Sequence, residues 1–149
     1  MDNAGPISHA TLKELHEKFR EIKHSVNNTL AVLMALSELG ARNPVQYEKL
    51  AKTVLSRGPD IVKQLQEYQG ALASPELAMF EERFREARQA VNGKLAEIIT
   101  LSELAQKNGV PYEKLATTVL TLGPDIVNLL QDFQTLVYGK MKAAEPPQA

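Results

Sequence analysis

The chain contains the same sequence twice. Residues 15–73 align with residues 80–138 without a gap, and 30 of the 59 aligned pairs are identical. The segment Gly58–Val62, for example, returns unchanged as Gly123–Val127. A duplication of this kind predicts a protein built from one structural unit used twice. We therefore expect two similar units that pack against each other.

The apolar residues predict that both units are helical. They recur at steps of three and four, which is the spacing of one helix face, and no strand-like alternation competes. Aromatic residues make up only 5% of the chain and Trp is absent, so the core must be mostly aliphatic, which suits helix-on-helix packing. The first long segment shows the pattern at Leu12, Leu15, Phe19, Ile22, Val26, Leu30 and Leu33.

The segment Gly58-Pro59-Asp60 predicts an interruption within each unit. Gly58 suits a left-handed helix cap, Pro59 suits a first helical turn, and Asp60 suits the positive end of a helix dipole. Each unit would then be a hairpin of one long helix and a return arm kinked at Gly-Pro. Two such hairpins in tandem predict an all-α helical bundle.

The ends of the chain and the repeats define four segments. Thr11 and Glu14 form the pattern of a capping box, in which each side chain binds a backbone amide at a helix start. The two repeats are expected to pack as one domain. The predicted segments are a flexible arm at 1–9, helical repeats at 10–72 and 73–140, and a disordered tail at 141–149.

Composition excludes several classes of protein. The net charge of −1 gives no general attraction to nucleic acid or to an anionic membrane. The absence of Cys excludes disulfides, thiolate metal sites and cysteine nucleophiles. The longest apolar run, Leu30–Leu36, is far shorter than the roughly 20 residues that span a bilayer, and residues 1–6 do not show the pattern of a secretory signal. We expect a cytoplasmic protein with no membrane span.

The histidines do not form a metal-binding pattern. His9, His16 and His24 are spaced by seven and eight residues, whereas helical metal sites usually place their ligands four residues apart. Phosphate-binding loops and dinucleotide fingerprints are also missing. The sequence therefore predicts no metal, no cofactor and no catalytic residue.

The only remaining candidates for catalytic residues are a pair of tyrosines and a pair of glutamates, each repeated in the two units. Tyr47 and Tyr112 each follow a turn, where tyrosine typically closes the end of a bundle with its ring inside. A catalytic centre would require Glu38 and Glu103 to meet these tyrosines, and the sequence does not place them together. We therefore predict that the protein is not an enzyme.

The differences between the repeats point to an interaction surface. Arg57 and Gln64 of the first repeat correspond to Leu122 and Leu129 of the second. Leu129 and its neighbour Leu130 cannot both point into the core of a helical bundle. The extra leucines either pack the two repeats together or form a contact with another protein. The candidate interface residues are Leu122, Leu129, Val137 and Tyr138.

Two function hypotheses follow. The first is a non-enzymatic protein–protein interaction or scaffold module that self-associates as a homodimer or binds a protein partner. The second is a carrier of an apolar, lipid-like small molecule, in which Asn27 or Asn92 beside the apolar stripe would orient the polar end of the ligand. The same asparagines could instead fix the register of the helices.

Overall fold

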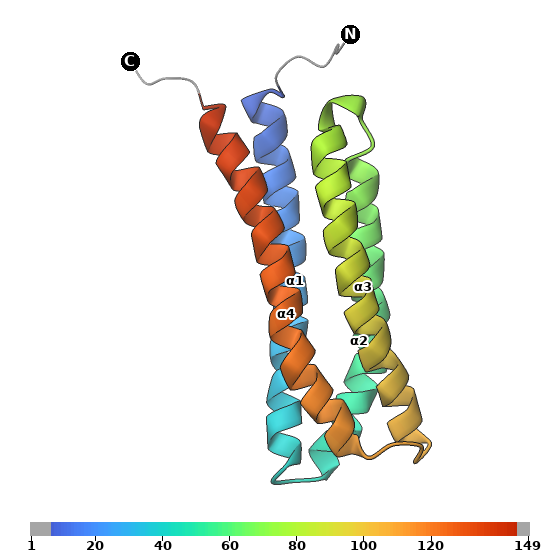
Figure 1. Ribbon diagram of the computed structural model, residues 1–149. Coiled ribbons are helices and arrows are strands. Elements are labelled where there is room, and N and C mark those ends of the chain that lie inside the picture. Colours follow the sequence, from blue (N-terminus) through green and yellow to red (C-terminus); the bar gives the residue numbers. More distant parts are fainter. Residues whose placement is uncertain (1–6, 146–149) are drawn as a thin grey trace.

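The computed structural model describes residues 7–145 and confirms the all-α prediction. Within this range the chain forms four long helices and one short 3-10 helix (Figure 1). The elements are α1 (His9–Gly40), α2 (Val45–Ala71), η1 (Pro75–Leu77), α3 (Ala78–Gln106) and α4 (Tyr112–Ala143).

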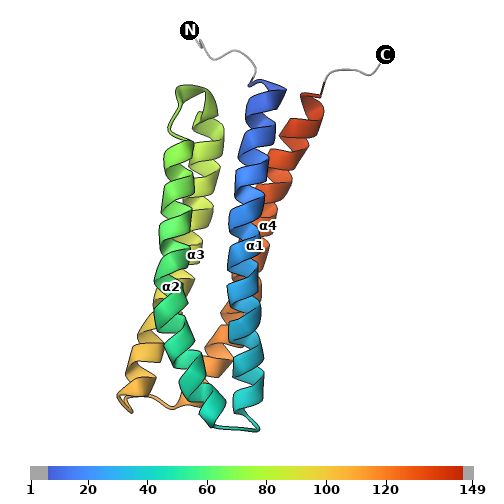
Figure 2. The same cartoon turned by 180° about the vertical axis from the view of Figure 1, so that it is seen from behind.

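The four helices form an up-down-up-down bundle. Each helix packs on the next one in the chain, and α1 also packs on α4, which closes the ring. Figures 1 and 2 show α1 beside α4 and α2 beside α3, with the start of α1 and the end of α4 at the same end of the bundle. The longest helices contain 32 residues, and at 1.5 Å per residue they are about 48 Å long. The first hairpin is α1 with α2, and the second is α3 with α4.

The predicted break at Gly-Pro-Asp is wrong, although the kink is present. α2 runs without interruption from Val45 to Ala71 with Pro59 inside it, and α4 likewise contains Pro124. Figures 1 and 2 show that the ribbons of α4 and α2 bend in their first halves. Proline has a helix-compatible φ but cannot donate the backbone hydrogen bond, so it bends the helix. The helix does not end there, because its apolar face stays buried both before and after the proline.

The glycines before these prolines serve helix packing instead of capping. No glycine in the described chain has a positive φ, so Gly58 is not a left-handed cap. A Cβ atom on Gly58 would lie 3.1 Å from Cδ1 of Ile99, and one on Gly123 would lie 3.0 Å from Sδ of Met34. Met34 and Ile99 are equivalent positions of the two repeats. Each glycine therefore makes room for a side chain of the other hairpin.

The helix ends differ slightly from the predicted boundaries. Ser8, and not Thr11, caps α1, because the backbone N–H of Thr11 donates to Oγ of Ser8 at 3.1 Å. α4 continues through Ala143, so residues 141–143 of the predicted tail are helical. Residues 1–6 of the predicted arm and residues 146–149 of the tail lie outside the described part of the chain.

An aromatic layer crosses the core near the end where the chain begins. Each helix contributes one ring, and rings on adjacent helices have centroids 4.9 to 5.3 Å apart. The two diagonal pairs join equivalent positions of the repeats, and both have centroids 6.1 Å apart with the planes 85° to 86° from parallel. Such edge-to-face contacts add about 0.5–1.5 kcal/mol per pair beyond the burial of area. The rings belong to Phe19, Tyr68, Phe84 and Phe133.

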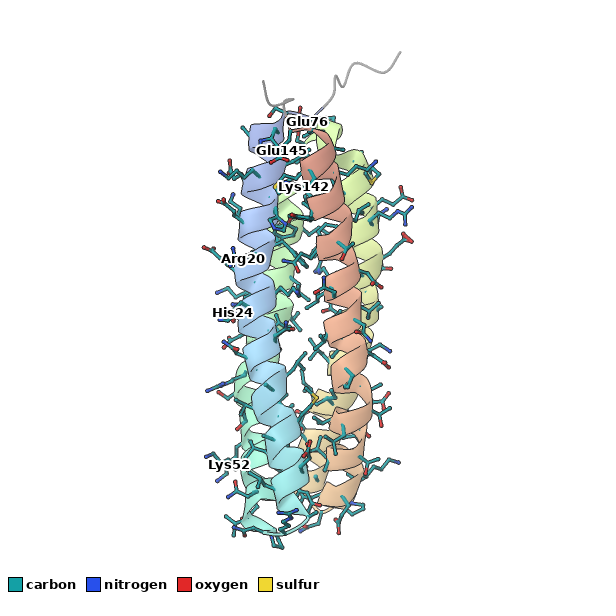
Figure 3. The ribbon with its side chains drawn as sticks, turned by 90° about the vertical axis from the view of Figure 1, so that its left-hand side faces the viewer. Arg20, His24, Lys52, Glu76, Lys142 and Glu145 are labelled. Carbon is teal, nitrogen blue, oxygen red and sulfur yellow. The ribbon has the colours of Figure 1, made fainter. Side chains whose placement is uncertain are left out.

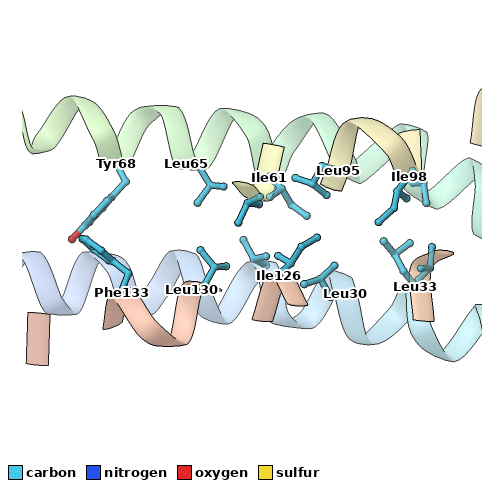
Figure 4. Close-up of a cluster of buried hydrophobic side chains, with 14 of the residues drawn as sticks. Leu30, Leu33, Ile61, Leu65, Tyr68, Leu95, Ile98, Ile126, Leu130 and Phe133 are labelled. Atoms are coloured by element: carbon cyan, nitrogen blue, oxygen red, sulfur yellow. The ribbon is translucent and has the colours of Figure 1, made fainter. Parts of the chain in front are cut away.

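Aliphatic layers continue the same two-fold arrangement toward the turns. Leu30 and Leu95 are equivalent residues of α1 and α3, and Ile61 and Ile126 are equivalent residues of α2 and α4. All four are at most 2% exposed and face one another across the core (Figure 4). One buried cluster thus draws on all four helices, and each repeat covers the apolar face of the other.

Two stacked tyrosines close the turn end of the bundle. The rings of Tyr47 and Tyr112 have centroids 6.2 Å apart and planes within 6° of parallel. Gly40 lies so close to the ring of Tyr47 that an added Cβ would overlap it. The equivalent of Gly40 in the second repeat is Ala105, and there Tyr112 is less buried than Tyr47. The absence of a side chain at Gly40 therefore allows Tyr47 to be buried more deeply than Tyr112.

We predict that Gly40→Ala destabilises the protein by about 1–3 kcal/mol, because the added methyl group forces the ring of Tyr47 out of its place. Gly93→Ala is the matched control. It lies on an exposed part of α3 with no atom near its Cβ position, and should stabilise the helix by about 0.5–1 kcal/mol. Urea denaturation measures both free energies of unfolding. Equal effects of the two substitutions would show that Tyr47 does not occupy this position.

We also predict a pH-dependent role for Tyr68. Its hydroxyl donates to the backbone O of Leu15 at 3.0 Å, and burial raises its pKa well above the ordinary value of 10. The unfolded chain loses this proton at about pH 10 while the folded chain keeps it, so stability falls as the pH rises above 10. The slope from this group approaches about 1.4 kcal/mol per pH unit.

Tyr68→Phe tests this role, because the equivalent residue of the other repeat is already Phe133. The variant should lose about 0.5–1.5 kcal/mol at pH 8 through the missing hydrogen bond. The difference from the wild type should shrink as the pH rises from 10 to 11 in urea denaturation. A difference that stays constant over that range would contradict the assignment.

Candidate functional site

The groove between α3 and α4 contains hollows with apolar side chains in their lining. A hollow of about 290 Å³ lies over Leu129, Leu136 and Ala87, and a second of about 350 Å³ continues from Leu129 past Ala90. Leu122 lies seven residues before Leu129, and Leu136 lies seven residues after it. Residues seven apart lie on one face of a helix, so the three leucines form a ridge along α4. We call this surface the leucine groove.

The equivalent groove of the first repeat is polar. The hollow between α1 and α2 has about 260 Å³ and lies over Arg57 and Gln64, at the positions where α4 has Leu122 and Leu129. Its other polar lining residues are Ser25, Thr29 and Asp60. Since both grooves come from one repeated unit, the difference is confined to their side chains. The groove of the second repeat is therefore apolar where the equivalent groove of the first repeat is polar.

Charged residues border the leucine groove on both sides. Arg83, Glu86 and Lys94 belong to α3, whereas Asp125 and Asp132 belong to α4, so the basic residues lie on the α3 side only. The ammonium of Lys94 lies 3.9 Å from a carboxylate oxygen of Asp125, and both side chains are partly exposed. Each basic residue thus lies at about the level of an acidic one across the groove.

Another polar hollow lies between α1 and α4. It has about 330 Å³ and is lined on α1 by His16 and Arg20. Figure 3 looks onto these two helices and labels Arg20 on α1. The ammonium of Lys23 donates to the side-chain oxygens of Gln131 and Gln134, which joins the two helices below the hollow. The lining residues on α4 are Gln131, Gln134, Thr135 and Tyr138.

His16 is the ionisable side chain of this hollow with a shifted pKa. Burial lowers its pKa below the ordinary 6.5, and the positive charges of Arg20 and Lys23 lower it further, against the opposite effect of Glu17. Its ring packs against that of Tyr138, with centroids 5.3 Å apart. Its Nδ1 is buried and forms no hydrogen bond with any residue of the described chain.

The structure separates the four predicted interface residues. Leu122 and Leu129 lie on the leucine groove and are partly buried. Val137 is 0% exposed in the core, so its prediction as a contact residue is wrong. Tyr138 is 47% exposed but belongs to the hollow between α1 and α4. Sequence reasoning missed Leu136, which the seven-residue spacing from Leu122 and Leu129 could have identified.

The two repeated asparagines lie beside the core. Asn27 and Asn92 are partly buried, and the Oδ1 atom of each is buried without a hydrogen bond from the described residues. Neither lines any of the hollows described above. The neighbouring core positions are filled by Leu30 and Leu95, which are at most 1% exposed. Whether the asparagines set the helix register stays a prediction.

The remaining candidate residues do not gather into a site. In residues 7–145, no three His, Asp or Glu side chains are grouped so that they could share a metal ion. Tyr47 and Tyr112 meet at the turn end, but Glu38 and Glu103 point into solvent there. In the same residues, every helix is too short or too polar to cross a bilayer.

Comparison with protein-family models, with curated proteins and with solved structures finds no match for this chain.

We predict that Arg20→Gln raises the pKa of His16, because it removes a positive charge that disfavours the imidazolium. In the wild type, the unfolded chain takes up this proton near pH 6.5 and the folded chain at lower pH, so His16 reduces stability as the pH falls below 6.5. NMR titration of the imidazole C–H resonances measures the pKa. Arg85→Gln, the equivalent change in the other repeat, is the control and should leave His16 unchanged. An unaltered pKa in Arg20→Gln would contradict the placement of Arg20.

Proposed function

We propose that the protein is a non-enzymatic interaction module that self-associates through the leucine groove. The observation that carries this proposal is the contrast between the two equivalent grooves. The first repeat shows that the fold tolerates Arg57 and Gln64 at these positions, so packing within the bundle does not require leucine there. Apolar side chains gathered on one surface groove are typical of a protein-binding site.

A second copy of the chain is the partner that the charges favour. A two-fold axis parallel to the bundle would place α3 of one copy over α4 of the other. Arg83 and Lys94 of each copy would then face Asp132 and Asp125 of the other at matching levels. The leucine ridges would cover each other in the centre, and the charged pairs would form a polar rim, as in other stable interfaces.

The alternative of a lipid-like carrier gains no support from the described residues. A carrier needs an apolar cavity, and the hollows described above are surface grooves that Asn27 and Asn92 do not line. A further hollow of about 370 Å³ over Leu12 and Phe80 is mostly apolar, but the two asparagines do not line it either. We propose a cytoplasmic location for the module, which the absence of Cys permits.

The double substitution Leu122→Arg and Leu129→Gln tests the proposal with residues that the first repeat already uses. It should abolish self-association while leaving the melting temperature within a few degrees, since the stem of an arginine can cover apolar surface. Sedimentation velocity over a hundredfold range of concentration measures the association. The reverse double substitution, Arg57→Leu and Gln64→Leu, gives the first repeat a second leucine groove and should strengthen association.

A wild-type chain that stays monomeric over the whole range would overturn the proposal. So would a dimer whose dissociation constant is the same in the wild type and in the Leu122→Arg, Leu129→Gln variant. Circular dichroism on each variant separates a lost contact from a lost fold.

A further inference from the structure

The groove between α2 and α3 contains a carboxylate that connects its polar side chains. The Nε2 amide of Gln69 donates to an oxygen of Glu81 at 2.8 Å, and NH1 of Arg85 lies 3.4 Å from the other oxygen. NH1 of Arg88 donates to Oε1 of Gln69 at 2.6 Å. The amide of Gln69 is therefore fixed between a cation on its oxygen side and the carboxylate of Glu81 on its nitrogen side.

The groove between α1 and α4 is the equivalent surface on the other side of the bundle. Lys23 corresponds to Arg88 and Gln134 corresponds to Gln69, and the same contact is present, because the ammonium of Lys23 donates to Oε1 of Gln134. The position of Glu81, however, is occupied by His16. This groove thus keeps the cation and the amide of its counterpart but lacks the carboxylate.

In this groove, the hydrogen-bond donors that a carboxylate would satisfy have no acceptor among the described residues. Arg20 corresponds to Arg85, yet it forms no ion pair with any residue of the described chain. The Nε2 amide of Gln134 donates to no residue in 7–145, whereas that of Gln69 is bonded to Glu81. Both side chains border the hollow of about 330 Å³, whose lining contains no acidic residue.

We propose that the α1–α4 groove binds the carboxylate of a ligand, which takes over the role that Glu81 has toward the amide and the guanidinium of the α2–α3 groove. The guanidinium of Arg20 and the amide of Gln134 hold the two oxygens, and Thr135 and Tyr138 line the same hollow. A planar carboxylate matches the fork of a guanidinium, and the resulting hydrogen bonds are about twice as strong as neutral ones. The carboxylate belongs to an acidic side chain of another protein or to a small organic acid.

This inference is independent of self-association through the leucine groove. That groove lies between α3 and α4, and the substitutions that test it do not touch His16, Arg20 or Gln134. Either proposal can therefore fail without the other.

The test is an NMR titration of the full ¹⁵N-labelled chain. Sodium acetate is added against sodium chloride at the same ionic strength, and the side-chain resonances of Gln134 and Arg20 are followed. We expect saturable shifts with acetate beyond those with chloride. The capped peptide acetyl-Ala-Glu-Ala-amide is titrated in the same way. Binding at least tenfold tighter than acetate supports a protein partner, and equal binding supports a small acid.

Two variants exchange the residues at this position between the two grooves. His16→Glu supplies the internal carboxylate that the counterpart already has, so it should weaken the acetate response at Gln134 at least tenfold and raise the melting temperature. Glu81→His removes the carboxylate from the α2–α3 groove, so an acetate response should appear at Gln69 and Arg85. Because the two changes act in opposite directions at equivalent positions, a folding defect in one cannot explain both results.

The proposal is overturned if acetate shifts no side chain of this groove more than chloride does. It is also overturned if His16→Glu responds to acetate as the wild type does. Equal affinity for acetate and for inorganic phosphate would reject the assignment to a carboxylate.

Discussion

The four interlocking aromatic rings connect all four helices at one level, and the positions of the other core layers depend on this contact. Each ring touches its neighbours edge to face, so a rotation or a shift of one helix along its axis would separate at least two pairs. From this layer toward the turns, aliphatic residues of equivalent positions meet across the core. Gly58 and Gly123 then receive Ile99 and Met34 from the other hairpin. The packing is specific because it joins the two hairpins as well as the helices within each.

Most buried positions are identical in the two repeats, whereas the grooves on the surface differ. Core positions such as Leu30 and Leu95 are identical and equally buried, because a change in volume at a packed position costs stability. The grooves tolerate substitution, and there the repeats have diverged: leucine for arginine and glutamine on one face, and histidine for glutamate on another. Both proposed binding surfaces lie where equivalent residues of the repeats differ in chemistry.

The sequence predicted the all-α bundle well because helical periodicity and the duplication are both long-range, redundant signals. It failed at Gly58, where the local pattern indicated a cap, but the apolar face continues through Pro59 and keeps the helix intact. Comparing the repeats placed Leu122 and Leu129 outside the core, where they lie, and their role as contacts stays a prediction. Val137 lies in the core, which the sequence did not indicate, because an apolar residue near a helix end gives no sign of which way it faces. The pairing of His16 with Tyr138 and Gln134 depends on which hairpin faces lie together, and the sequence of one chain does not state that.

The contacts between the hairpins occur in equivalent pairs, such as Lys23 with Gln134 and Arg88 with Gln69. A molecule consisting of one hairpin could form the same contacts with a second identical molecule. The short connection between α2 and α3 makes this encounter intramolecular, which sets a high effective concentration and removes any need for a partner in solution. The covalent connection also allows the two hairpins to differ in sequence. In a dimer of identical hairpins every substitution appears on both sides, whereas the covalent link lets the opposite grooves acquire different side chains and hence different ligands.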